Sequence, residues 1–242
     1  MQVWSWPGFW SYFTNPYLLG GAATTLGLTL ATLVLGMIVA FMLVLFKMSG
    51  NRVLGGIAWF HVWLFRGTPL LVQLIIIYTG LPQLGLMRLN VLESALLGLV
   101  LNEAAYLSEI LRAGIESVGR GQRDAAMALG LNRWKAFVLV TMPQAMRVIV
   151  PALGNSVNGL LKTTSIASVI SMEELLRRGQ VLMQQRFEVL EVFVCIAIIY
   201  LAMTTVWDLI QRRIEAHYAK AYAVRSVAAT ALPDVALARD DR

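Results

Sequence analysis

Charge and cysteine are both scarce in this sequence. Only 14% of its 242 residues are Asp, Glu, Lys or Arg, whereas 58% are hydrophobic, and the mean hydropathy is +0.67. A chain this poor in charge does not form an ordinary soluble globule, and the composition indicates an integral membrane protein. The single cysteine, Cys195, lies in an apolar run and has no second cysteine to pair with, so an internal disulfide is excluded.

Several catalytic and nucleotide-binding motifs are also missing. No Gly directly precedes a Lys, so the chain has no P-loop to cradle ATP, and any energy from ATP must come through a partner. The sequence contains no H-E-x-x-H and no G-x-S-x-G motif. His61 and His217 lack metal-ligand neighbours, so we expect no metal site and no enzymatic activity. The net charge of +6 falls mostly between apolar stretches, which indicates membrane orientation rather than nucleic-acid binding.

Apolar stretches long enough to cross a bilayer follow one another along the chain. Residues 1–46 contain no charged side chain, and the aromatic residues near the start predict an interfacial N-terminal segment over residues 1–19. The stretches predict spanning helices at residues 20–46, 53–81, 89–111, 148–172 and 189–207. The sequence therefore predicts an all-α, polytopic membrane protein with five transmembrane helices.

Lys and Arg are distributed unequally over the segments between these stretches. They are concentrated just after the first stretch, in the loop after the third, and beyond the fifth. Because such residues favour the cytoplasmic side, we expect the N-terminus outside and the C-terminus inside. The predicted parts are an outer segment at 1–19, a transmembrane domain at 20–218 with an inner loop at 113–147, and a cytoplasmic tail at 219–242 that we expect to be disordered.

Polar side chains lie at membrane depth in the second and third stretches. Arg66 would lie roughly 20 Å along a straight second span, near the bilayer centre, where it must face protein or water. A kinked helix with a snorkelling arginine is the alternative. Asn102, Tyr106 and Glu109 share one helical face, which is typical of a pathway or of a bond to a neighbouring helix. For Glu109 and Arg112 we expect a structural role, in which they pair with each other or with loop residues.

The fourth stretch carries a similar set of polar residues. Asn155 and Asn158 lie three residues apart, and Lys162 follows four residues later, so these three side chains are expected to share a face. Lys162 is the only residue with a formal charge in this stretch.

The inner loop contains a segment that reads as two short helices around a glycine. Residues 122–129 are rich in helix formers, and their three alanines leave a thin wall that a partner's backbone can approach. Gly130 is placed to end this helix in a left-handed conformation, Asn132 to cap the next one, and Pro143 to stop it. The alternative is an ordinary basic loop on the cytoplasmic side.

The spacing within this loop resembles a known family. Asp124-Ala125-Ala126, then Gly130, then Val140-Thr141-Met142-Pro143 resembles the EAA loop of bacterial ABC importer permeases. In that loop an acidic residue, two alanines, a glycine and a distal Ile-x-Leu-Pro mark the helix that docks on the ATPase. This chain has Asp for Glu, Val for Ile and Met for Leu, and each change keeps the charge sign or the apolar character.

Three further stretches resemble the polar amino acid branch of these permeases. Phe65-Arg66-Gly67-Thr68-Pro69 is similar to the signature of that branch, and Asn102-Glu103-Ala104-Ala105-Tyr106 supports it. Residues 161–166 are similar to a family stretch that helps to line the translocation path. Thr163 stands where that stretch often has Asp, which weakens the case for a strictly cationic substrate.

The resemblance implies a type I ABC importer permease fold in a bacterial inner membrane, with residues 1–19 in the periplasm. It also implies a second permease subunit, identical or sister, a pair of ATPases that hold ATP and Mg, and a periplasmic binding protein that delivers a polar amino acid. The chain itself is then a transport subunit that binds no cofactor, and a docking helix near 122–130 couples it to the ATPase.

Two sets of site residues follow from the motifs and from the polar faces. The residues expected to couple the chain to the ATPase are Gln122, Asp124, Ala125, Ala126, Leu129, Gly130 and Pro143. The residues expected along the substrate path are Arg66, Thr68, Asn102, Glu103, Tyr106, Asn155, Asn158, Lys162, Thr163 and Ser165. Of these, Arg66 or Lys162 is suited to a substrate carboxylate and Glu103 to its amine.

Two other classes of function remain open at this point. An ATP-independent channel or secondary transporter would need no ATPase, although the internal repeats common in secondary transporters are not found here. A non-transporting membrane scaffold would use Arg66 and Lys162 as packing partners for glutamates of neighbouring helices.

Overall fold

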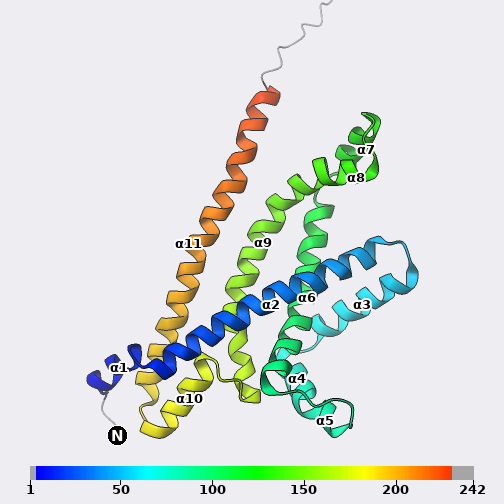
Figure 1. Cartoon of the computed structure of the whole chain (residues 1–242). Coiled ribbons are helices and arrows are strands. Elements are labelled where there is room, and N and C mark those ends of the chain that lie inside the picture. Colours follow the sequence, from blue (N-terminus) through cyan, green and yellow to red (C-terminus); the bar gives the residue numbers. More distant parts are fainter. Residues whose placement is uncertain (1–3, 231–242) are drawn as a thin grey trace, which may run out of the picture.

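The computed structural model describes residues 4 to 230, with side chains described up to residue 218, and every regular element in that part is a helix (Figure 1). The predicted all-α class is therefore confirmed. The elements are α1 (Trp6–Phe13), α2 (Pro16–Met48), α3 (Arg52–Gly67), α4 (Leu70–Ile75), η1 (Ile76–Gly80), α5 (Leu81–Gln83), α6 (Val91–Glu116), α7 (Arg120–Ala128), α8 (Arg133–Ala136), η2 (Phe137–Thr141), α9 (Met142–Thr163), η3 (Thr164–Ile170), α10 (Leu175–Arg186) and α11 (Val189–Thr230).

Four stretches are long and apolar enough to cross a membrane as single helices. They are Pro16–Met48, Val91–Glu116, Arg133–Ile170 and Val189–Tyr218. A fifth span arises when the two bent helices Arg52–Gly67 and Leu70–Gln83 are taken together. The predicted five spans therefore hold, with the second one broken.

The break in the second span is a turn of 106° between α3 and the helices that follow. Thr68 is extended, with φ −125° and ψ 149°, because the ring of Pro69 disfavours a helical conformation in the residue before it. The expected depth of Arg66 assumed a straight helix. That assumption is wrong, since Arg66 lies in the last turn before the bend.

Small residues bring the two central helices together. α2 packs along α6, and Ala40 and Ala104 are both fully buried in the cluster that joins these helices to α3. Gly36 leaves room for Leu107, whose Cδ1 atom would lie 3.5 Å from an added Cβ. Close backbone approach through small side chains is the usual basis of helix packing in lipid, where apolar burial alone does not drive helices together.

The end helices wrap around the other end of α2. α1 packs on α11, where the backbone N–H of Ser5 donates to Oε1 of Glu191 at 2.8 Å and the Tyr12 hydroxyl donates to Glu188. Burial and the bond to Glu188 raise the pKa of Tyr12 to about 12. The described part of the predicted interfacial segment is thus a helix that is fixed to the bundle.

Glu174 fixes α10 in the same region. Its carboxylate caps α10 by accepting from the backbone N–H groups of Leu176 and Arg177, and it also accepts from the Tyr200 hydroxyl at 2.8 Å. Burial of this fully enclosed carboxyl raises its pKa above the ordinary glutamate value.

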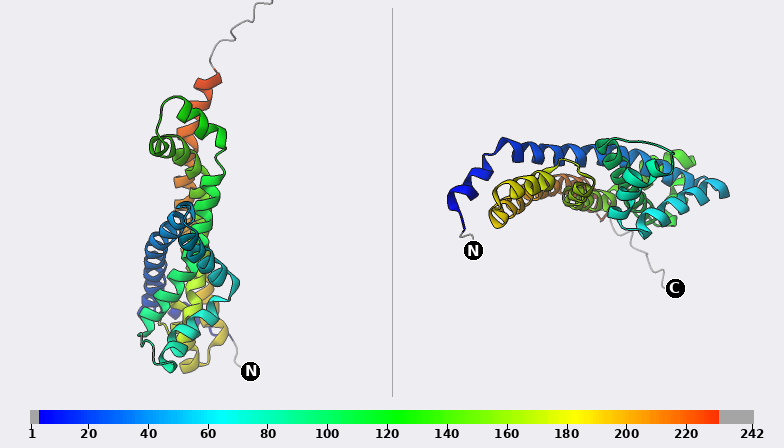
Figure 2. Two further views of the ribbon diagram at one scale, coloured as in Figure 1. Left: turned by 90° about the vertical axis from the view of Figure 1, so that its right-hand side faces the viewer. Right: turned by 90° about the horizontal axis from the view of Figure 1, so that it is seen from below.

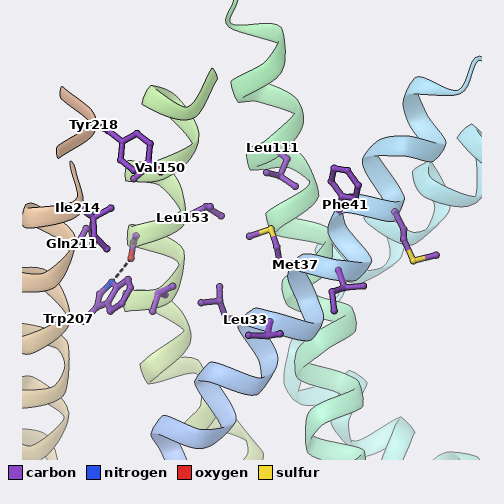
Figure 3. Close-up of a pocket in the computed structure, with 15 residues that line it drawn as sticks. Leu33, Met37, Phe41, Leu111, Val150, Leu153, Trp207, Gln211, Ile214 and Tyr218 are labelled. Atoms are coloured by element: carbon purple, nitrogen blue, oxygen red, sulfur yellow. Dashed lines mark hydrogen bonds between the residues drawn. The ribbon is translucent and has the colours of Figure 1, made fainter. Parts of the chain in front are cut away.

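α11 and α9 meet through an indole contact. The Trp207 Nε1–H donates to the carbonyl oxygen of Gly154 at 2.8 Å, drawn as a dashed line in Figure 3. A Cβ at Gly154 would lie 2.4 Å from Cδ of Gln211, so a larger residue there would displace the Gln211 side chain. Seen from below, the helices form a curved slab with α1 and α10 near one end and α3 near the other (Figure 2).

Two prolines follow a π-helical turn at the same offset. Pro82 comes two residues after η1 and Pro143 two residues after η2. A proline has no N–H and its ring clashes with the carbonyl four residues earlier, and a wider turn absorbs both effects. The prediction that Pro143 stops a helix is therefore wrong, because the helical path continues from Arg133 to Ile170.

The last helix is longer than the sequence analysis predicted. α11 continues to Thr230, so residues 219–230, assigned above to a disordered tail, are helical. Their alanine-rich sequence favours continuation of the helix. Residues 231–242 lie outside the described part of the chain, and the prediction of disorder there stays a prediction.

Candidate functional site

A cavity of about 780 Å³ lies between the α3–α4 bend, α6 and α9. Seven of the ten predicted path residues line it: Arg66, Thr68, Asn102, Glu103, Tyr106, Asn155 and Thr163. The bend in the second span brings Arg66 and Thr68 next to the polar face of α6. The cavity thus collects most of the polar groups that the sequence placed at membrane depth.

An amide pair holds the bend against α6. Asn102 Nδ2 donates to the Phe65 carbonyl at 3.0 Å and to Oε1 of Gln73 at 3.1 Å. Gln73 Nε2 in turn donates to the carbonyl and hydroxyl oxygens of Thr68, at 3.1 and 2.9 Å. These bonds satisfy carbonyls that the bend leaves without a helical partner. Asn102 therefore supports the cavity wall, and Gln73, which the sequence analysis did not select, is its main partner.

Glu103 joins α6 to α9. Its side chain is buried, with 8% of the residue exposed, and it accepts a hydrogen bond from the Ser156 hydroxyl. Both residues line the cavity. Ser156 was also missed, because it directly follows Asn155 and therefore lies about 100° around the helix from the polar face on which Asn155 was placed.

Arg66 faces the cavity from the end of α3. Its guanidinium lies 5.3 Å from the ring centroid of Tyr106, and Nη1 is 3.9 Å from Oε2 of Glu109. At 3.9 Å this ion pair is loose, and 44% of the Arg66 side chain is exposed. The guanidinium therefore retains donors that can reach a ligand.

Glu109 is the centre of a charge cluster that links three helices. It accepts from Lys47 of α2 at 2.5 Å and from Arg112 of α6 at 2.8 Å, in addition to the longer contact with Arg66 of α3. The expected pairing of Glu109 with Arg112 is confirmed. Lys47 is a further partner that sequence spacing could not supply, since it lies 62 residues away.

Three predicted path residues on α9 share a face, as expected, and that face is turned toward α11. Asn155 is 3.4 Å from Gln211 Nε2, Asn158 donates to Asp208 at 2.5 Å, and Lys162 lines a smaller cavity beside α11. The smaller cavity has a volume of about 420 Å³, and Ser165 also lines it.

The main cavity instead receives the neighbouring face of α9. Its contributions from this helix include Ala152, Ser156, Gly159 and Thr163, at helical spacing. Asn155 reaches both sides, whereas Asn158, Lys162 and Ser165 do not line this cavity.

The short helices of the inner loop have the local geometry that the sequence predicts. Gly130 has φ +87°, and the Asn132 side chain accepts from the Lys135 backbone N–H at 2.8 Å. Both details are confirmed. These features are local because a left-handed residue and a cap are set by side chains a few positions apart.

The predicted coupling residues lie on different sides of α7. Gln122, Asp124 and Ala125 are exposed, and Leu129 is 85% exposed. Ala126, by contrast, is 5% exposed and is turned toward the chain itself, where α7 packs on η2. Pro143, at the start of α9, is half-buried. A partner that docks on α7 would therefore meet Ala125 and Leu129 rather than Ala126.

Within the described part of the chain, no group of three His, Cys, Asp or Glu side chains is arranged to hold a metal ion. The polar groups that line the main cavity are amides, hydroxyls, the two carboxylates of Glu103 and Glu109, and the guanidinium of Arg66. Such a set binds small polar or zwitterionic molecules through hydrogen bonds and ion pairs.

Comparison with known proteins gives matches over most of the chain. Residues 32–220 match the family described as "Binding-protein-dependent transport system inner membrane component". The arginine transport system permease protein ArgU of Corynebacterium glutamicum is 36% identical over 90% of this chain and 73% of its own length. The glutamine transport system permease protein GlnP of Escherichia coli is 33% identical over 87% of this chain and 95% of its own length.

A solved structure of an amino acid ABC transporter with histidines is similar in fold. It is 34% identical in sequence, has a TM-score of 0.83, and covers 90% of this chain and the whole of that chain.

Proposed function

This chain belongs to the family of binding-protein-dependent transport system inner membrane components, and we propose that it carries a polar amino acid across the membrane as one permease subunit of an ABC importer. Its relatives are permeases of amino acid transport systems, so the chain is a multi-pass protein of the inner membrane.

The observation that carries the proposal is the lining of the main cavity. Arg66 supplies a guanidinium and Glu103 a carboxylate to one cavity between α3, α6 and α9. An amino acid has one group for each, because its carboxylate pairs with a guanidinium and its amine with a carboxylate. Lys162 lies in a different cavity, so Arg66 is the better partner for the substrate carboxylate. Asn155 and Thr163 remain for a polar substrate side chain.

The exposed side of α7 fits a docking role. Ala125 and Leu129 are exposed there, while Ala126 fixes the helix to η2 on its other side. η2 leads directly into α9, which forms one wall of the cavity. We infer that the ATPase, which would hold ATP and Mg, docks on this exposed side, and that a second permease and a periplasmic binding protein complete the importer.

The mechanism follows from that continuity. Closure of the ATPases on ATP would displace α7 and α8, and α9 would move with them because no loop separates it from α8. The cavity would then open to the opposite side of the membrane. Such alternation between two states, biased by nucleotide, is what alternating access requires.

The substrate assignment is tested by amino acid uptake in proteoliposomes. Arg66→Gln should weaken substrate binding about 10-fold to 100-fold, because a charge-assisted hydrogen bond contributes about 1.5–3 kcal/mol. Lys162→Gln is the matched control, with the same loss of one positive charge and little expected effect. Equal losses in both variants would place the substrate elsewhere.

The docking assignment is tested by co-expressing this chain with the P-loop ATPase of the importer and purifying the two together. Leu129→Glu should abolish retention of the ATPase, since it puts a charge on the exposed side of α7. Leu84→Glu is the control, because Leu84 is also exposed, at 73%, and follows α5 far from α7. If no variant changes retention, α7 is not the docking helix. If the unmodified chain never retains the ATPase, the channel or scaffold functions become preferable.

A further inference from the structure

An apolar groove of about 920 Å³ lies beside the short helices of the inner loop. Its walls come from the end of α2, from α6, from α7 and α8, and from η2 and the start of α9. Methionines and aromatic residues line it, including Met127, Trp134 and Met146. Two cations, Arg123 and Arg133, also line it, and none of its other lining residues is charged.

The two arginines lack a partner of opposite charge in the described part of the chain. Neither takes part in an ion pair between described residues, and Nε of Arg123 is buried without a hydrogen-bond partner there. A buried guanidinium nitrogen without an acceptor is costly, and an anion at the groove would satisfy it. The groove therefore combines apolar walls with two arginines that have no anionic partner among the described residues.

The groove also adjoins a second groove further along α2. Phe41 and Leu111 line both this groove and a second apolar groove of about 790 Å³ between α2, α6, α9 and α11 (Figure 3). In Figure 3 these two side chains lie at the upper right of the group, whereas Trp207 lies at the lower left and Leu33 below them. Gln211 lines the second groove beside Trp207, and no charged side chain lines that groove.

We propose that the paired grooves hold an anionic phospholipid, with its phosphate between Arg123 and Arg133 and an acyl chain directed past Phe41 and Leu111. Trp134, 71% exposed, marks the level of the headgroups, where amphipathic rings gather. Basic pockets between spanning helices on the cytoplasmic side are known to select anionic headgroups. This site is separate from the transport cavity, and the inference does not depend on the proposed substrate.

The arginines, rather than the apolar walls, set the selectivity. An acyl chain leaves lipid to enter the groove, so contact with apolar walls brings little gain over the bilayer itself. The phosphate is different, because each nearby Lys or Arg strengthens binding of an anionic lipid about fivefold, and two together about thirtyfold. The expected preference is therefore for phosphatidylglycerol over phosphatidylcholine.

Native mass spectrometry of the full chain, purified alone and with its ATPase, tests this proposal. Both samples are equilibrated with equal amounts of phosphatidylglycerol and phosphatidylcholine, and the retained lipids are counted. Arg123→Gln with Arg133→Gln should lower retention of phosphatidylglycerol about thirtyfold and leave phosphatidylcholine unchanged. Arg120→Gln is the matched control, since Arg120 is an exposed arginine on α7 outside the groove.

A second variant tests the apolar walls without altering charge. Leu45 lines the groove and is 50% exposed, so Leu45→Trp should fill it and lower retention of phosphatidylglycerol. Leu30→Trp is its control, because Leu30 is 63% exposed on the same helix and lines neither groove. Retention that is equal in the double arginine variant and in Arg120→Gln would overturn the proposal. Loss of the lipid from the unmodified chain whenever the ATPase is bound would assign the groove to the subunit interface instead.

Discussion

Replacing Glu109 by Gln should destabilise the fold more than replacing any exposed carboxylate. Glu109 accepts from Lys47 at 2.5 Å and from Arg112 at 2.8 Å, and Arg66 lies 3.9 Å away. These cations come from α2, α6 and α3, so one carboxylate ties three helices together. The amide of Gln keeps the shape of the side chain, but it leaves Lys47 and Arg66 without their carboxylate partner and Arg112 with Glu116 alone.

The loss of folding free energy depends on how exposed each partner of Glu109 is. Side chains of Lys47 and Glu109 are 23% and 20% exposed, so their bond retains most of the value of a charge-assisted hydrogen bond, about 1.5–3 kcal/mol. Arg112 and Arg66 are 39% and 44% exposed, so their contributions are discounted to below about 1 kcal/mol each. The expected loss for Glu109→Gln is about 3 kcal/mol.

Thermal unfolding in detergent, followed with a thiol-reactive dye, measures this loss. The single cysteine, Cys195, is fully buried, so the dye reports its exposure on unfolding. A loss of about 3 kcal/mol should lower the midpoint by about 6 to 12 °C in a chain of this size. Glu116→Gln is the control, because Glu116 is 61% exposed and pairs with Arg112 alone among the described ion pairs. Equal midpoints for the two variants would refute the reasoning.

Three further predictions concern the end helices and the small residues. The raised pKa of Tyr12, about 12, means that folding favours the neutral phenol, so stability should fall between pH 10 and 12. Tyr12→Phe should remove that fall, and an unchanged pH profile would contradict it. The pKa of Glu174 is raised as well, so the folded chain binds more protons than the unfolded chain above the ordinary glutamate pKa. The unfolding midpoint of Glu174→Gln should therefore rise relative to the unmodified chain as the pH is raised from 4 to 7. Gly179→Ala places a Cβ 1.9 Å from Cδ1 of Ile196 and should cost about 1–3 kcal/mol, whereas Gly27→Ala meets nothing within 4 Å and should be neutral or slightly stabilising in the same dye assay.

Features set by neighbouring residues could be predicted from the sequence. The left-handed Gly130 and the cap at Asn132 depend on chemistry within a few positions, and the apolar spans depend on the length of each run. The pairing of Glu109 with Arg112 is also local, at a separation of three residues.

Features set by contacts between distant residues could not be predicted from the sequence. Periodicity shows that Asn158 and Lys162 share a face, but the packing of α11 decides that this face is turned away from the main cavity. Pro69 marks a break in the second span, yet its angle depends on Gln73 and on Asn102, 29 residues further along the chain. From the sequence, the small residue Ala126 is suited to a surface on which a partner docks. The structure shows instead that η2 packs on α7 and that Ala126 is buried.

The uninterrupted helical path from Arg133 to Ile170 gives the molecule a two-armed lever. The indole of Trp207 pins it at Gly154, near its middle, and the two arms measure about 32 Å and about 24 Å at 1.5 Å per residue. A tilt of about 5° about this fulcrum moves both ends by about 2–3 Å, in opposite directions. A small push at α8 thus becomes an opposed displacement of similar size at η3.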